Sequence, residues 1–154
     1  MHDAAIGGAG FLLAVLWFDL MFDVQVRGHG SDPLPEPVLR SIAAYYRRVT
    51  TEAQPMNRLV GAAMLLTFSA TVAELLRSRD NPAFALLSLA CVAAAVGLAL
   101  TKTVRNAVAL GREAGEAGAR SKLARSIYRD HKICFAFMCA FCVLQAADRL
   151  LAHH

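Results

Sequence analysis

Four long apolar stretches, separated by polar connections, dominate the pattern of hydrophobic and polar positions. They cover residues 4–26, 58–76, 83–104 and 132–152. About 20 consecutive, mostly apolar residues cross a hydrocarbon core about 30 Å thick as one α-helix. Each stretch has that length, so the sequence predicts an all-α integral membrane bundle of four transmembrane helices. We expect this bundle to form a single domain over residues 1–154.

The composition agrees with this prediction. Hydrophobic residues make up 56% of the 154 residues and charged residues 18%. Soluble globular domains contain about 45–50% apolar and about 25% charged residues. The mean hydropathy is +0.43. Disordered and fibrous proteins are therefore excluded, and a soluble domain is disfavoured.

Lys and Arg are concentrated at one end of the predicted helices. Thirteen of the 16 lie in or directly beside the two long connections, residues 27–57 and 105–131. Short connections rich in Lys and Arg stay on the cytoplasmic side of a membrane. We therefore expect both connections in the cytoplasm and both termini on the opposite side. The net charge of +4 then indicates anionic lipid headgroups as partners, and nothing in the pattern is typical of nucleic-acid binding.

The first connection contains a predicted amphipathic helix. It begins near Pro37, a favourable first helical residue, and ends near Pro55. Apolar residues recur at spacings of three and four and form a stripe along one side of the helix. The stripe consists of Val38, Ile42, Tyr45, Tyr46 and Val49, and the arginines lie outside it. This pattern is typical of a helix that lies in the headgroup region of a bilayer.

The second connection is interrupted by glycines. Gly111, Gly115 and Gly118 each destabilise a helix by about 1 kcal/mol relative to alanine, so we expect a bend or hinge there. The connection lacks the residues of a P-loop. A solvated loop facing the lipid is therefore favoured over a phosphate site.

Two carboxylates in the first predicted transmembrane helix are the leading candidates for catalysis. Asp19 and Asp23 lie four residues apart, on one helix face. A charge at the centre of a membrane helix costs about 2.5–3.5 kcal/mol, so Asp19 needs a partner, water or a proton. Asp23 is close enough to the helix end to pair with Arg27. Proton transfer by Asp19 is the simplest chemistry that this pair predicts.

Cationic side chains at similar depth on the other helices are candidate ligand-binding residues. They are Arg58, Lys102, Arg105 and His131. With the two aspartates they would surround a polar cavity open to the cytoplasm, and this predicts a protein that binds a small amphiphilic or anionic molecule. Whether it also acts on that molecule is left open by the sequence. The alternative is that they anchor the helix ends at the membrane interface.

A second polar set lies in the outer half of the predicted bundle. Thr67, Thr71 and Glu74 share one face of the second transmembrane helix, and Gln145 lies on the fourth. They would form a conduit in a small transporter or channel subunit, or hydrogen bonds between helices. Small residues such as Ala93 and Gly97 let helices approach closely, so a homo-oligomer is also compatible with the sequence. A further alternative is a non-catalytic protein that assembles with another membrane protein.

Cys139 and Cys142 form a C-x-x-C motif in the fourth predicted transmembrane helix. This placement resembles the vitamin K epoxide reductase type of quinone-reducing enzymes, which implies a redox role. Those enzymes use a second cysteine pair in a loop, and no predicted loop here contains cysteine. Thiols buried in an apolar helix react poorly, so the alternative is that both act as small hydrophobic residues.

Histidines and the overall plan add little about cofactors. No histidine lies inside a predicted span, so a bis-histidine haem in the membrane is excluded. The sequence predicts no metal site, and His153 and His154 are not assigned to any site. Length, helix number and basic loops resemble the small membrane proteins of eicosanoid and glutathione metabolism, which implies a cytoplasm-facing site between protomers. Their glutathione-binding run of polar residues is missing from the second helix, and the sequence assigns no cofactor.

Overall fold

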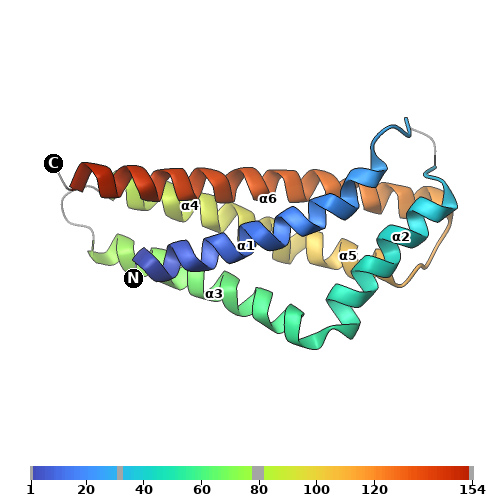
Figure 1. Cartoon of the computed structure of the whole chain (residues 1–154), viewed down its shortest axis with the longest axis horizontal. Coiled ribbons are helices and arrows are strands. Elements are labelled where there is room, and N and C mark those ends of the chain that lie inside the picture. The colour runs from blue at the N-terminus through green and yellow to red at the C-terminus, as the bar shows by residue number, and fades with distance from the viewer. Residues whose placement is uncertain (1, 31–32, 78–81, 153–154) are drawn as a thin grey trace.

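The computed structural model describes residues 2–30, 33–77 and 82–152, so Arg79, His153 and His154 lie outside the described residues. Helices and no strands form this part of the chain (Figure 1). The α-helices are α1 (His2–Asp23), α2 (Glu36–Arg47), α3 (Gln54–Arg77), α4 (Pro82–Leu98), α5 (Val104–Gly111) and α6 (Ala117–Ala152). A 3-10 turn, Val24–Val26, follows α1. The π-helical segments Arg48–Glu52 and Ala99–Thr103 follow α2 and α4.

Four helices are long and apolar enough to cross a membrane, which confirms the predicted all-α chain with four such helices. They cover His2–Val26, Pro55–Arg77, Pro82–Gly111 and Ala117–Leu151. The last two are longer than predicted, because α4 continues into α5 and α6 begins at Ala117. Most of the predicted connection 105–131 is therefore helical. The chain reverses over residues 112–116, where Gly115 has a φ of +95°, a conformation that glycine adopts without strain.

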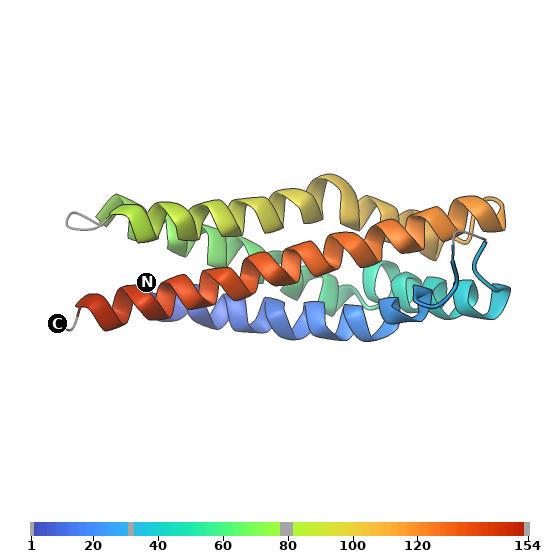
Figure 2. The ribbon, with the colours of Figure 1, turned by 90° about the horizontal axis from the view of Figure 1, so that it is seen from above.

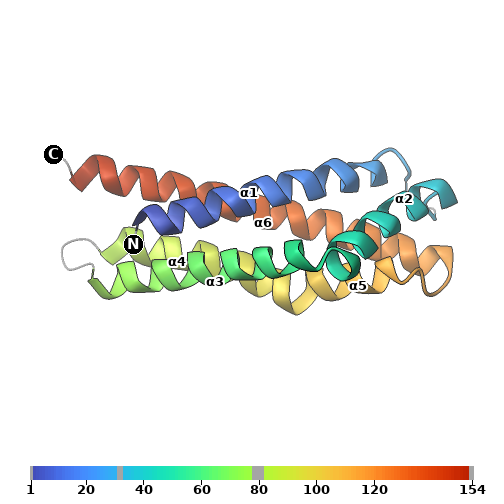
Figure 3. The same cartoon turned by 60° about the horizontal axis from the view of Figure 1, so that its bottom comes forward.

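The four long helices run alongside one another, and α1 begins at the end of the bundle where α6 finishes (Figures 1 and 2). We call this the terminal end. At the opposite end, the loop end, α2 leads from the far end of α1 back to the start of α3 (Figure 3). The bundle therefore keeps its two long connections together, and the site described below lies near them.

The predicted amphipathic helix is α2, but its apolar face is covered by protein. Leu39 and Ile42 are fully buried and belong to one hydrophobic cluster with Leu110 of α5 and Ile127 of α6. Fully burying a side chain of this size contributes about 1.5–3 kcal/mol. Packing inside the protein thus accounts for the apolar stripe, and contact of α2 with a membrane surface stays a prediction.

Two glycines are required where helices approach closely. A side chain on Gly8 would collide with the Thr67 hydroxyl on α3, and a Cβ on Gly111 would lie 2.8 Å from the backbone nitrogen of Arg47. The pair Ala93 and Gly97 differs, because Ala93 is exposed and a Cβ on Gly97 would meet nothing within 4 Å. These two residues do not pack inside the described chain.

Candidate functional site

Three helices bring a cluster of polar side chains together at the loop end. Helix α1 contributes Asp19 and Asp23, α2 contributes Tyr45 and Tyr46, and α6 contributes His131. The two aspartates are one helical turn apart, so both face the same neighbours. The adjacent tyrosines meet one aspartate each. We call these five residues the loop-end cluster.

Asp23 is the innermost member of the loop-end cluster and is 0% exposed. Its Oδ1 accepts a hydrogen bond from the Tyr46 hydroxyl at 2.6 Å, and its Oδ2 lies 2.7 Å from Nδ1 of His131. The prediction that Asp23 pairs with Arg27 is wrong for the described residues. The chain turns extended at Arg27, and this residue is exposed, so it is not at the i+4 position of a continuous helix.

His131 is held between the two carboxylates. One proton joins Nδ1 of His131 to Oδ2 of Asp23 across their 2.7 Å contact. The other ring nitrogen, Nε2, lies 3.8 Å from Oδ2 of Asp19, which is longer than a hydrogen bond. Asp23 thereby orients the ring, as a carboxylate partner orients histidine at many sites. The nitrogen beside Asp19 keeps its hydrogen-bonding capacity.

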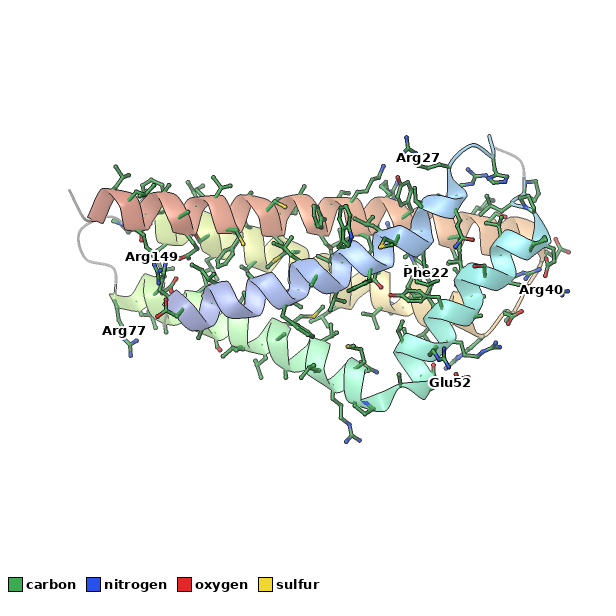
Figure 4. The ribbon with its side chains drawn as sticks, viewed as in Figure 1. Phe22, Arg27, Arg40, Glu52, Arg77 and Arg149 are labelled. Atoms are coloured by element: carbon green, nitrogen blue, oxygen red, sulfur yellow. The ribbon has the colours of Figure 1, made fainter. Side chains whose placement is uncertain are left out.

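Asp19 differs from Asp23 in having only one strong partner. Its Oδ1 accepts a hydrogen bond from the Tyr45 hydroxyl at 2.7 Å, and its side chain is 13% exposed. Burial raises the pKa of Tyr45 and of Tyr46, and the neighbouring carboxylates raise both further. Both hydroxyls therefore stay protonated and act as donors. Phe22 stacks on Tyr45 with ring centroids 4.0 Å apart, between α1 and α2 (Figure 4).

All members of the loop-end cluster except Asp23 line one wall of a cavity of about 390 Å³, within the range of about 300–1,000 Å³ typical of ligand pockets. Most of the lining is apolar. It includes Leu12, Val15 and Leu16 of α1, Val60 and Met64 of α3, Val96 of α4, and Cys134 and Met138 of α6. Phe18, Phe22 and Met56 also line the cavity and are 59%, 37% and 44% exposed. The cavity therefore has an opening between α1 and α3, which diverge toward the loop end (Figure 1). Val104 of α5, 43% exposed, also lines the cavity.

Of the four predicted ligand-binding residues, only His131 lines this cavity. Lys102 instead pairs with Asp130 of α6, whose carboxylate is 3.0 Å away and whose residue is 1% exposed. Arg58 and Arg105 are exposed and are not among the lining residues. Among the described lining residues there is no Lys and no Arg.

The hydroxyls of the predicted conduit bond to their own helix. Thr67 donates to the carbonyl of Ala63 and Thr71 donates to the carbonyl of Thr67, both at 2.8 Å. Both threonines are 0% exposed. This back-bonding satisfies the hydroxyls inside α3, so neither needs a partner across the bundle.

The remaining conduit residues meet at the terminal end. Nε2 of Gln145 donates to Oε2 of Glu74 at 2.9 Å, and the other carboxylate oxygen lies 3.5 Å from Nδ1 of His2. We call these three residues the terminal-end cluster. A layer of buried apolar side chains, including Leu12, Val92, Ala70, Met138 and Phe141, lies between this cluster and the loop-end cluster.

Cysteines and metal ligands add no second site. The four cysteines are free thiols, and Cys139 and Cys142 are partly exposed on α6 and do not line the cavity. Among the described residues no group of three or more His, Cys, Asp or Glu side chains could hold a metal ion. The chemistry available at the cavity is therefore hydrogen bonding and proton exchange by Asp19 and His131.

Three functional residues were missed by reasoning from the sequence. Tyr45 and Tyr46 were assigned to an apolar stripe, and Asp130 was not recognised as the partner of Lys102. The available signal was the use of tyrosine rather than phenylalanine at two adjacent buried positions, because a buried hydroxyl needs a partner. Two aspartates four residues apart on a neighbouring helix supply the acceptors.

Comparisons with protein-family models, with curated proteins and with solved structures find no match for this chain.

Proposed function

We propose that this is a multi-pass membrane protein that binds a small amphiphilic molecule in the cavity beside the loop-end cluster. The apolar part of the ligand packs against α1, α3, α4 and α6, and its polar end hydrogen-bonds to Asp19 and His131. The loop end faces the cytoplasm, since it carries most of the Lys and Arg residues, and both termini lie on the other side.

One observation carries this proposal: an apolar cavity ends at two polar atoms that retain unused hydrogen-bonding capacity. Oδ2 of Asp19 and Nε2 of His131 are 3.8 Å apart, so a polar ligand atom between them would contact both. Tyr45 holds Asp19 in place and Asp23 holds His131 in place, each across 2.7 Å. Such preorganised groups bind without a large entropic cost.

The charge of the lining limits which end groups the ligand can have. Asp19 is the cavity's acidic residue, and no described lining residue is Lys or Arg. An anionic end group would add negative charge beside two carboxylates in a region shielded from water, which is unfavourable. The proposal is therefore for a ligand whose polar end is not anionic.

Native mass spectrometry after release from a gentle detergent tests the proposal. Wild-type protein should carry one lipophilic molecule per chain, and Asp19→Asn should retain at least about tenfold less, a loss of about 1.4 kcal/mol in binding. Asp3→Asn is the matched control, because Asp3 lies on the same helix with a 92% exposed side chain. Wild-type protein with nothing bound, or equal retention by Asp19→Asn, would overturn the proposal.

A further inference from the structure

We propose that the ligand of this cavity is a lipid alcohol, a long apolar chain with a single uncharged hydroxyl, which enters sideways from the loop-end leaflet between α1 and α3. This inference rests on the proposed function and adds the class of ligand and its route.

The hydrogen-bonding capacity of Asp19 and His131 selects the end group. If Asp19 and Asp23 were both ionised and His131 were neutral, two net negative charges would lie inside the bundle, at a large cost in free energy. At least one further proton therefore stays between Asp19 and His131. The pair then presents one donor and one acceptor, 3.8 Å apart. A hydroxyl, which both donates and accepts, satisfies both atoms at once.

Charged end groups fit this pair less well. A carboxylate only accepts hydrogen bonds and would add negative charge beside the loop-end cluster. An ammonium only donates, so it would have to displace the proton of the pair before both atoms could accept hydrogen bonds from it. Neither mismatch arises with an alcohol, whose desolvation is also the smallest of the three.

The route follows from which lining residues are exposed. Phe18 and Phe22 on α1, Met56 on α3 and Val104 on α5 line the cavity and are each at least 37% exposed. All four lie on helices long and apolar enough to span a membrane, so their exposed surfaces face lipid chains rather than water. Two of the four are on α1, the helix that carries Asp19, which favours the side of α1 for the route. A long chain held at Asp19 would leave the cavity between these side chains and continue into the bilayer.

Phe22 links the route to the polar end of the cavity. Its ring stacks on Tyr45 at 4.0 Å between centroids, and the Tyr45 hydroxyl donates to Asp19 at 2.7 Å. A chain that passes Phe22 therefore touches the residue that orients Asp19. Phe22 and Tyr45 are positioning residues for the hydroxyl.

Photo-crosslinking in zwitterionic phospholipid vesicles tests the inference. The probes are a long-chain alcohol with a diazirine in the chain, and the carboxylic acid and the amine with the same chain and diazirine. The alcohol should label peptides of α1 and α3, and His131→Ala should lower this labelling by about tenfold, or about 1.4 kcal/mol. Stronger or equal labelling by the acid or the amine would overturn the choice of an alcohol.

A matched pair of variants tests the route. Phe18→Arg should slow labelling by the alcohol, because it places a charge at the opening. Leu100→Arg should leave the rate unchanged, since Leu100 is equally exposed, at 59%, and does not line the cavity. Equal slowing by both variants would overturn entry between α1 and α3.

The same experiments separate the two proposals. If native mass spectrometry finds a bound lipophile but the alcohol probe does not label the cavity, the proposed function stands and this inference fails. If no lipophile is bound and no probe labels the cavity, both fail.

Discussion

The two polar clusters of the bundle are similar in composition and different in construction. In the loop-end cluster, Asp23 is fully buried and both of its oxygens have close partners. In the terminal-end cluster, the Glu74 side chain is 17% exposed, and buried atoms of His2, Glu74 and Gln145 lack hydrogen-bond partners. The complete pairing of Asp23 holds it and His131 in fixed positions, so the comparison identifies the loop-end cluster as the preorganised one.

The cavities beside the two clusters differ in the same way. The terminal-end cavity, about 350 Å³, is lined mainly by polar and charged residues of both signs: Glu74, Arg77, Ser88, Gln145 and Asp148, with Phe84 and Ala85. The loop-end cavity is mostly apolar, with its polar groups gathered at one wall. An apolar cavity with few placed polar groups is the usual form of a site for a lipophilic ligand. The predictions below test this difference.

Matched substitutions of the two acids should have the largest effect. Asp23→Leu leaves His131 and Tyr46 buried without their acceptor, and breaking a buried pair in this way costs about 3–5 kcal/mol. Glu74→Leu removes a partly exposed carboxylate and should cost about 1–2 kcal/mol, mainly for the amide of Gln145. Equilibrium unfolding in detergent micelles measures both. Equal losses would show that the clusters are not different in construction.

Matched substitutions of the two close-contact glycines should have the next largest effect. Gly111→Ala at the loop end meets the backbone of Arg47 and should cost about 3 kcal/mol, the upper part of the range for overpacking. Gly8→Ala meets the side chain of Thr67, so Gly8→Ala combined with Thr67→Ala should recover most of the lost thermal stability. Failure of that rescue would mean that α1 and α3 are not in contact there.

The two tyrosines should separate stability from binding. Tyr46→Phe leaves Oδ1 of Asp23 buried without a donor and should destabilise the protein by about 1–2 kcal/mol. Tyr45→Phe should destabilise it less, because Asp19 is partly exposed, but should lower retention of the bound lipophile more. Thermal unfolding and native mass spectrometry of both variants test this, and the reverse order of effects would contradict it.

The smallest effect is expected at a partly exposed ion pair of the loop end, between Arg120 and Glu36. Hydrogen bonds from Arg120, and then from Arg40, hold the pKa of Glu36 below its usual value. Because the folded pKa is the lower one, the pair stabilises the protein above the usual pKa of Glu, and this contribution is lost as the pH falls through the folded value. The difference in stability between wild type and Arg120→Gln should shrink over that acidic range. A constant difference would contradict the assignment.

Much of the fold could be predicted because its causes are local. Each long apolar run predicts a helix, since an α-helix satisfies its backbone hydrogen bonds within one segment. The face of α2 that carries Ile42 and Tyr46 was also predictable from spacing. The covering of that face was not, because spacing shows which side is apolar and does not show whether lipid, α5 or α6 lies against it.

The candidate site, like the fold, was predictable from the sequence only in part. By itself the sequence determined the four apolar helices, the side of α1 that carries Asp19 and Asp23, and their need for partners, because burial of a carboxylate is costly wherever it occurs. Only the tertiary structure decided that the partners are Tyr45, Tyr46 and His131, and that Lys102 turns to Asp130. The physical reason is that hydrogen bonds act over about 3 Å, so the choice depends on how the helices are packed and rotated.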